Sequence, residues 1–133
     1  METKKLTLNE YQEAAMTTCM PSSSNFSYMF LNLVGEVGEF ASKVAKSIRK
    51  GHSVIGGKFT NELAIKKDLY EDETAALRKE AGDILWQLSG LCAIMGWELN
   101  EVAQENLDKL QARKAAGTID GSGDGVTKEE RNA

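Results

Sequence analysis

The chain has 133 residues, of which 41% are apolar and 27% charged, and its formal net charge is −4. This length suits one domain with a hydrophobic core. The acidic balance argues against general nucleic-acid or membrane-surface binding, which usually needs a basic face. Cys19 and Cys92 lack CxxC spacing and are too few for a disulfide framework, so we expect reduced thiols in a cytoplasmic protein. No stretch reaches the ~18 apolar residues of a membrane span.

The N-terminal part of the chain predicts two helices separated by the single proline. Thr7-Leu8-Asn9-Glu10 has the form of a capping box, which predicts a helix that runs to about residue 20. Pro21 and the three serines after it predict a turn. A second helix is expected from about residue 25 to residue 50. Its predicted apolar stripe consists of Leu31, Val34, Ala41, Val44, Ala45 and Ile48.

The rest of the chain predicts further helices and a tail. Residues 51–60 hold three glycines and the single histidine, His52, so we expect a loop with the histidine exposed. Residues 61–70 are compatible with a short helix, and residues 73–95 predict a third long helix. Asn100 is expected to cap a last helix that ends near residue 116.

These elements predict an all-α fold, a four-to-five-helix bundle, because no segment shows the alternation typical of a strand. The two longest helices can pack along one another if their connection allows antiparallel packing. From residue 117 the sequence is rich in glycine and loses its periodicity. We therefore expect one helical domain over residues 1–116 and a flexible C-terminal tail over residues 117–133.

Two pairs of acidic residues indicate chemistry. Glu36 and Glu39 lie on the second predicted helix, and Glu80 and Asp83 lie on the third. Residues three apart share one helix face, so each pair directs two carboxyl groups to one place. If the two helices pack antiparallel, the four acids converge and repel one another unless a cation compensates them. Oxygen ligands of this kind suit Mg²⁺, which completes its shell with water and with substrate phosphates.

The alternative without a functional role is that each acid pair belongs to a solvated helix surface, which is the commoner role of such a pair in isolation. Glycine inside a helix costs about 1 kcal/mol relative to alanine. Gly35, Gly38 and Gly82 adjoin the acids, which suggests a close backbone approach or room for a ligand. No P-loop, Ser-His-Asp or Cys-His constellation is present, so hydrolysis of a phosphoanhydride with a bound metal fits better than acyl transfer.

Three segments carry a resemblance to a known family. They are Leu33-Val34-Gly35-Glu36-Val37-Gly38-Glu39, Glu80-Ala81-Gly82-Asp83-Ile84-Leu85-Trp86 and Asn106-Leu107-Asp108-Lys109-Leu110-Gln111-Ala112-Arg113. Together they resemble the MazG-like all-α nucleoside triphosphate pyrophosphohydrolases, over about residues 11–124. The resemblance implies hydrolysis between the α and β phosphates to a nucleoside monophosphate and pyrophosphate, with nucleotide-pool housecleaning as its purpose. It also implies Mg²⁺ dependence, with Mn²⁺ as a substitute, and an obligate dimer or dimer of dimers.

The resemblance also assigns residues. Glu36, Glu39, Glu80 and Asp83 match the catalytic metal ligands; Asn106, Lys109 and, more weakly, Arg113 match residues that bind the substrate. Trp86 follows Asp83 by three residues and is a candidate for stacking on the nucleobase, although a core role is the commoner one for tryptophan.

Two departures from the family pattern stand out. Gly35 occupies the slot where many members carry an additional glutamate, which leaves four ligands but removes any secondary role of that acid. The segment between the acid pairs is also longer than usual, and we assign the excess to residues 51–73, as a lid or an interface element.

Two other functions remain open at this point. The first is a helical module without catalysis that binds nucleotide or a protein partner, which the missing acid at position 35 would favour. The second is hydrolysis of another phosphoanhydride, such as phosphoribosyl-ATP. A panel of triphosphates and related substrates, with and without Mg²⁺, separates these possibilities.

Overall fold

The computed structural model describes residues 2–55, 63–65 and 71–118. Four α-helices dominate these residues: α1 (Leu8–Met16), α2 (Phe26–Arg49), α3 (Glu71–Ile94) and α4 (Leu99–Ala116). A short 3₁₀ helix covers Pro21–Ser23, and two strands, β1 (Ser53–Ile55) and β2 (Leu63–Ile65), pair antiparallel with Ser53 opposite Ile65. No helix among the described residues has the length and hydrophobicity needed to cross a membrane.

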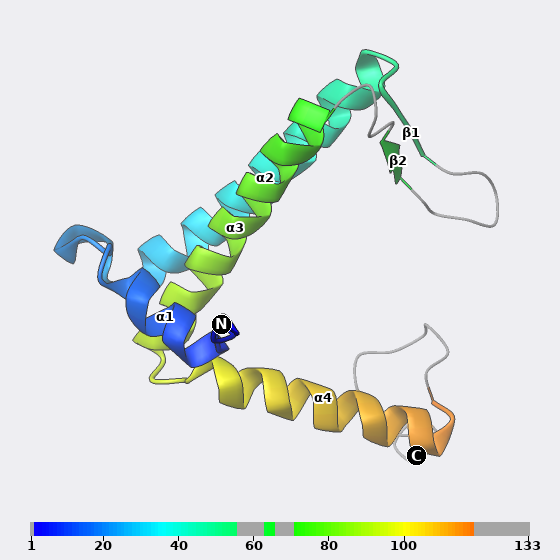
Figure 1. Cartoon of the computed structure of the whole chain (residues 1–133). Helices are drawn as coiled ribbons and strands as arrows, with labels where there is room; N and C mark the ends of the chain where they lie inside the picture. The colour runs from blue at the N-terminus through cyan, green and yellow to red at the C-terminus, as the bar shows by residue number, and fades with distance from the viewer. Residues whose placement is uncertain (1, 56–62, 66–70, 119–133) are drawn as a thin grey trace.

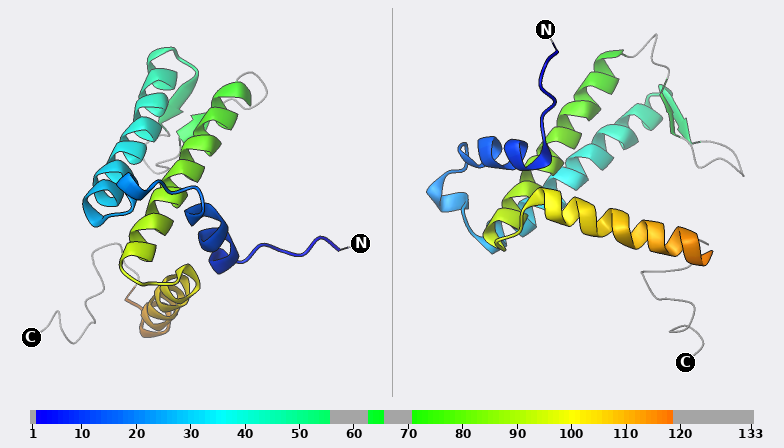
Figure 2. Two further views of the ribbon diagram at one scale, coloured as in Figure 1. Left: turned by 90° about the vertical axis from the view of Figure 1, so that its left-hand side faces the viewer. Right: turned by 60° about the horizontal axis from the view of Figure 1, so that its bottom comes forward.

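The helices form an open arrangement around one corner. α2 and α3 run antiparallel along each other and make the largest helix–helix contact (Figure 1). α1 packs against α3 and α4 near the corner where α3 ends, and α4 then extends away from the α2–α3 pair (Figures 1 and 2). The expected antiparallel packing of the two longest helices is therefore present.

Most of the helix boundaries follow from local signals. The predicted capping box is confirmed: the Thr7 side chain accepts a hydrogen bond from the Glu10 backbone, and the Glu10 side chain accepts one from the Thr7 backbone. Gly51, Gly96 and Gly117 each follow a helix with φ near +70°, between 67° and 74°. This left-handed conformation favours glycine, which explains why three helices end at these positions.

α1 is tied to the corner by side-chain amides. Gln12 donates to the carbonyls of Ser89 and Trp97 at 3.2 and 3.0 Å and accepts from the Leu99 backbone at 3.1 Å. Asn9 and Asn100 exchange hydrogen bonds: the Asn9 side chain accepts from the Asn100 backbone at 2.9 Å, and the Asn100 side chain accepts from the Asn9 backbone at 3.2 Å. These bonds satisfy the backbone groups where α4 begins.

Several local predictions are wrong. α1 ends at Met16, four residues earlier than expected, and the N-cap of α4 is Glu98, so the helix begins before Asn100. Residues 53–55 and 63–65 form strands, where a loop and a short helix were predicted. The remaining predictions for residues 56–62, 66–70 and 119–133 lie outside the described residues.

The buried apolar core of the described residues is small. It consists of Met29, Leu77, Cys92 and Leu99. Cys92 lies in this core, and both cysteines are free. The predicted stripe of α2 is largely wrong, because Leu31 and Val34 are 68% and 58% exposed. The residues that α2 buries are Met29 and Ser47. Many large apolar side chains of the single chain therefore lie in solvent.

α3 lies closely against the Met29 side chain of α2 at Gly90. A Cβ atom at this position would overlap the Sδ and Cε atoms of Met29, whose side chain is almost fully buried. The glycines beside the acids differ from Gly90: a Cβ at Gly38 or Gly82 would meet nothing within 4 Å. Of the two explanations that the sequence suggested for these glycines, a close backbone approach is absent among the described residues, and the open space beside them leaves room for a ligand.

We predict that Gly90→Ala lowers the free energy of unfolding by about 1–3 kcal/mol, because the added methyl group forces Met29 out of its position. Gly82→Ala is the matched control, since its methyl group meets open space. It should be neutral or should stabilise α3 by up to about 1 kcal/mol. Urea unfolding followed by circular dichroism measures both, and equal effects would show that the Met29 contact does not restrict this position.

Candidate functional site

Three of the four predicted acids converge where α2 and α3 face each other. Glu36 of α2 and Glu80 and Asp83 of α3 each place a carboxylate oxygen within 4.8 Å of the others. We call these three residues the acid cluster. Glu36 lies over forty positions before Glu80 and Asp83 in the sequence, and the antiparallel packing of the two helices brings them together (Figure 1).

Glu80 is the buried member of the acid cluster. The residue is 7% exposed, and its Oε1 atom lies 2.7 Å from Nζ of Lys43 on α2. This ion pair raises the pKa of Lys43, chiefly through the hydrogen bond to Glu80. The other oxygen, Oε2, is buried and has no hydrogen-bond partner in the structure. A buried carboxylate oxygen left unpaired is costly, so this atom is suited to a ligand that supplies positive charge.

Glu36 lies in a half-buried position beside these charges. Asn32, one turn earlier on α2, donates a hydrogen bond to its Oε1 at 3.4 Å. Its pKa is raised from the usual value, first by burial and then by the negative charges of Glu39, Asp83 and Glu80. The folded protein therefore holds a carboxylate whose charge is disfavoured until a cation approaches.

Glu39 is not part of the acid cluster. Its residue is exposed, although its charge still acts on Glu36 and on Lys43. The helix spacing places it one turn beyond Glu36, on the same face of α2. Glu39 is therefore near the acids but is not in position to share a ligand with all three of them in this structure.

The arrangement fits a divalent cation. Its donors are carboxylate oxygens from two helices, which is the ligand type that hard cations such as Mg²⁺ require. One buried oxygen of Glu80 lacks a partner, and the raised pKa of Glu36 reports uncompensated negative charge. Three of the four expected ligands thus fit a divalent cation in both chemistry and charge.

The predicted substrate-binding residues of α4 do not join the acids within one chain. Asn106 and Lys109 lie on α4, which packs against α1 and runs away from the α2–α3 pair (Figures 1 and 2). Arg113 lies in the last turn of the same helix, where its carbonyl accepts a hydrogen bond from Thr118.

Trp86 connects α3 to α1. Its indole nitrogen donates to the carbonyl of Ala15 at 3.2 Å and to the hydroxyl of Thr18 at 3.0 Å, and the residue is half-buried. These bonds give Trp86 a structural role, and stacking on a nucleobase stays a prediction.

Lys43 was missed by sequence reasoning. The available signal was its spacing, seven residues after Glu36 and four after Glu39, which places it on their helix face.

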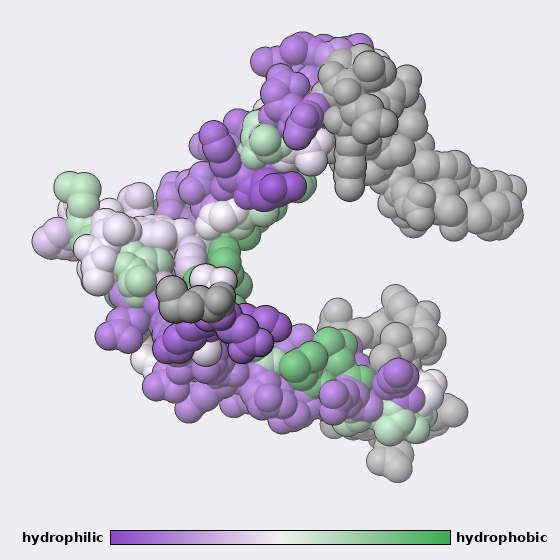
Figure 3. All heavy atoms as spheres, viewed as in Figure 1, coloured by the Kyte–Doolittle hydropathy of each residue, from purple (hydrophilic) through white to green (hydrophobic). Residues whose placement is uncertain are grey.

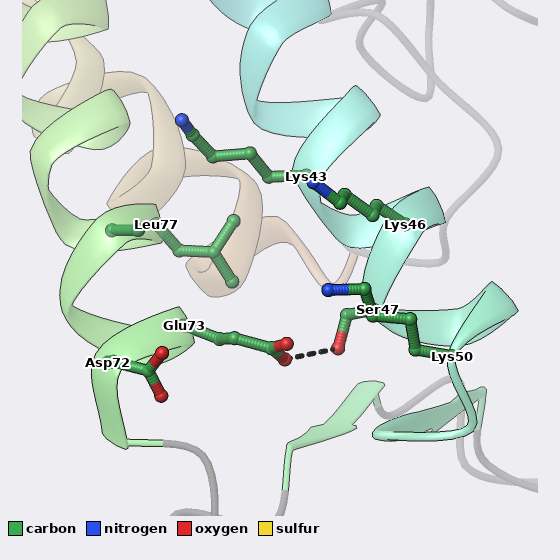
Figure 4. A pocket seen from close by; sticks show the side chains of 8 residues that line it. Lys43, Lys46, Ser47, Lys50, Asp72, Glu73 and Leu77 are labelled. Atoms are coloured by element: carbon green, nitrogen blue, oxygen red, sulfur yellow. Dashed lines mark hydrogen bonds between the residues drawn. The ribbon is translucent and has the colours of Figure 1, made fainter.

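A pocket of about 260 Å³ adjoins Lys43 between α2 and α3. It is lined by Lys43, Lys46, Ser47, Lys50, Asp72, Glu73, Ala76 and Leu77 (Figure 4).

His52 was also misjudged as exposed. The residue is half-buried, and its Nδ1 atom lies 2.7 Å from Oε1 of Glu73, while Ser47 donates to Oε2 of the same carboxylate at 2.9 Å. The hydrogen bond with His52 is the largest cause of the lowered pKa of Glu73. This cluster joins the end of α2 to the beginning of α3, so it holds the helix pair together beyond the acid cluster.

We predict that Glu36→Gln stabilises the protein in the absence of metal at neutral pH, because it removes a charge that the folded state disfavours. The folded pKa of Glu36 lies above its unfolded value, so wild-type stability falls as pH rises from the unfolded pKa through the folded one. The advantage of the variant should therefore be complete above the folded pKa and should vanish below about pH 4.5. Thermal unfolding in chelator across this range measures it, and an advantage independent of pH would contradict the electrostatic cause.

Comparison with known proteins assigns the family. The MazG nucleotide pyrophosphohydrolase domain matches residues 24–117, which include α2, α3 and α4 and all four predicted acids. The Gene 37 protein of Mycobacterium phage L5 is 36% identical over 121 residues, covering 86% of this chain and 94% of that protein. No solved structure matches the chain. The resemblance carried by the acid pairs is thereby confirmed, and the chain belongs to the MazG nucleotide pyrophosphohydrolase family.

Proposed function

We propose that the protein is a nucleoside triphosphate pyrophosphohydrolase that requires Mg²⁺, for which Mn²⁺ can substitute. The reaction converts a ribo- or deoxyribonucleoside triphosphate and water to the monophosphate and pyrophosphate, as a housecleaning step in the nucleotide pool. The observation that carries this proposal is the acid cluster, with three carboxylates from two helices within 4.8 Å and a buried Glu80 oxygen without a partner. Membership of the MazG family supports the reaction class.

In this proposal, Glu36, Glu80 and Asp83 would hold the cation, and Glu39 would turn toward them from its exposed position one turn further along α2. The bound cation supplies charge neutralisation and Lewis acidity toward the phosphoanhydride. Water attacks the α-phosphorus, one of these carboxylates takes the proton that the water loses, and the bond from the α-phosphorus to the bridging oxygen breaks. Lys109 compensates the charge on the departing pyrophosphate as a point charge.

We further propose that the active form is a dimer or a dimer of dimers. Large apolar residues lie exposed on α2 and on α4, among them Phe30, Leu31, Val34, Leu107 and Leu110. Apolar side chains also line the opening between the two arms of the molecule (Figure 3). Exposed apolar surface of this extent indicates an interaction site. A second copy would cover it and would bring Asn106 and Lys109 of its own α4 to the acid cluster of the first.

A second candidate function is a module that binds nucleotide without hydrolysing it. The observation that favours this alternative is the position of Glu39 outside the acid cluster. Pyrophosphate release from a panel of nucleoside triphosphates, with phosphoribosyl-ATP added, distinguishes the two. Release that depends on Mg²⁺ supports the enzyme, whereas binding without release from any substrate supports the module.

We predict that Glu80→Gln, and likewise Glu39→Gln, reduces pyrophosphate release by about 10²- to 10³-fold or more, because each substitution removes a charged ligand from the transition-state environment. Glu13→Gln is the matched control, since Glu13 is an exposed acid of α1 away from the acid cluster. Circular dichroism should show an intact helical fold in all three variants. Near-normal turnover of Glu80→Gln would refute the ligand assignment.

Complementation between two inactive variants tests the shared site. We predict that neither Glu80→Gln nor Lys109→Met alone is active, but that their co-expression restores about a quarter of wild-type turnover. In a mixed dimer one site would combine an intact acid cluster with an intact Lys109 from the other copy. If Lys109 acted on its own chain, every site would carry one substitution, and verified mixed dimers would stay inactive.

A further inference from the structure

We propose that Lys43 is a built-in counter-ion of the acid cluster, displaced from Glu80 by the divalent cation and thereby released to the phosphates of the substrate. Displacement concerns the cation site alone, whereas delivery to phosphate rests on the proposed function. Lys43 extends from α2 toward α3 (Figure 4), where its Nζ atom lies 2.7 Å from Oε1 of Glu80.

The charges explain why an ammonium group occupies this position. Without metal, the acid cluster gathers three carboxylates within 4.8 Å, and Glu39 adds a fourth nearby charge. Glu80 has only 10% of its side chain exposed, so water compensates its charge poorly. The Lys43 ammonium lies 2.7 Å from Oε1 and supplies the missing positive charge. Helices α2 and α3 can therefore pack around the acids before any metal arrives.

A divalent cation and the ammonium compete for this charge. A cation held by Glu36, Glu80 and Asp83 would stand beside the ammonium on the same carboxylate, where two positive charges repel strongly at low effective dielectric. Oε2 of Glu80 is free to accept the cation, but Oε1 is the atom that Lys43 occupies. Occupation by metal thus favours departure of Lys43.

The released side chain has a place to go. Lys43 has 42% of its side chain exposed, and its stem already lines the pocket shared with Lys46 and Lys50. Lys46 follows Lys43 by three residues on α2, Lys50 is the C-cap of this helix, and all three side chains extend toward α3 (Figure 4). A flexible ammonium at the mouth of this pocket is suited to the oxygen atoms of a polyphosphate held by the neighbouring cation.

Calorimetric titration with Mg²⁺ alone, in the absence of nucleotide, tests the displacement. Lys43→Met should bind Mg²⁺ roughly tenfold more tightly than wild type, because no ammonium has to leave Glu80. Lys43→Arg keeps the charge and should not tighten binding. Lys46→Met is the matched control, a lysine of the same helix and pocket without the bond to Glu80, and should bind Mg²⁺ as wild type does. Unchanged or weaker affinity in Lys43→Met would overturn the displacement.

Stability gives a second readout. Metal-free Lys43→Met should melt at a lower temperature than wild type, and saturating Mg²⁺ should raise its melting temperature by more than it raises that of wild type. If Lys43→Met does not fold without metal, the double variant Lys43→Met/Glu80→Gln removes both charges and should fold again. Failure of the double variant to fold would contradict the counter-ion role.

Kinetics at saturating Mg²⁺ test the delivery. Lys43→Met should raise the KM for the triphosphate despite its tighter hold on metal, and an unchanged KM would overturn delivery while leaving displacement in place. If wild type releases no pyrophosphate from any substrate, the proposed function fails, yet the Mg²⁺ titrations still decide the displacement.

Discussion

The contact of Met29 with Gly90 sets the register in which α2 and α3 run antiparallel, and the candidate site depends on that register. Glu36 lies seven residues after Met29 on α2, and Asp83 lies seven residues before Gly90 on α3. Two helices in antiparallel contact at one level meet again after the same number of residues on each, because a heptad is close to two helical turns. The absence of a side chain at position 90 and the meeting of the acids are therefore parts of one packing solution.

The negative charge of the acid cluster destabilises the folded chain, and a lysine of α2 compensates part of this charge. Burial and mutual repulsion raise the pKa of Glu36, and Glu80 holds one buried oxygen without a partner. Lys43 compensates the other oxygen of Glu80 at 2.7 Å. On the far side of the pocket, Glu73 is held by His52 and Ser47, which joins the helix ends. The helix pair thus leaves negative charge uncompensated at the acid cluster, whereas the carboxylate of Glu73 has its partners. Uncompensated charge of this kind is expected where a ligand completes the site.

The sequence predicted what depends on neighbouring residues and missed what depends on distant ones. The Thr7 capping box and the glycine stops act within one turn, so the long helices were predicted nearly to their ends. Pairing of residues 53–55 with 63–65 is non-local and has no alternating pattern to announce it. The wrong face was chosen for α2 because this helix carries apolar residues on several faces, and periodicity alone cannot select the one that meets α3. The acid pairs were found because their spacing is local, whereas Lys43 acquires its role only when α3 faces it.

The proposed self-association explains both the wrong prediction for the apolar stripe of α2 and the distance of α4 from the acid cluster. Leu31 and Val34 are largely exposed in the single chain, and Asn106 and Lys109 lie on α4, which runs away from the acid cluster of its own chain. A single copy therefore lacks a partner for its apolar surface and does not bring Lys109 to its own acid cluster. Because burial of apolar area drives association, the surface that α3 leaves uncovered would supply the free energy that positions α4 of another copy. The apolar residues of α2 would then form two interfaces, one with α3 and one with a second subunit. The stripe predicted from the sequence would belong to the interface with the second subunit.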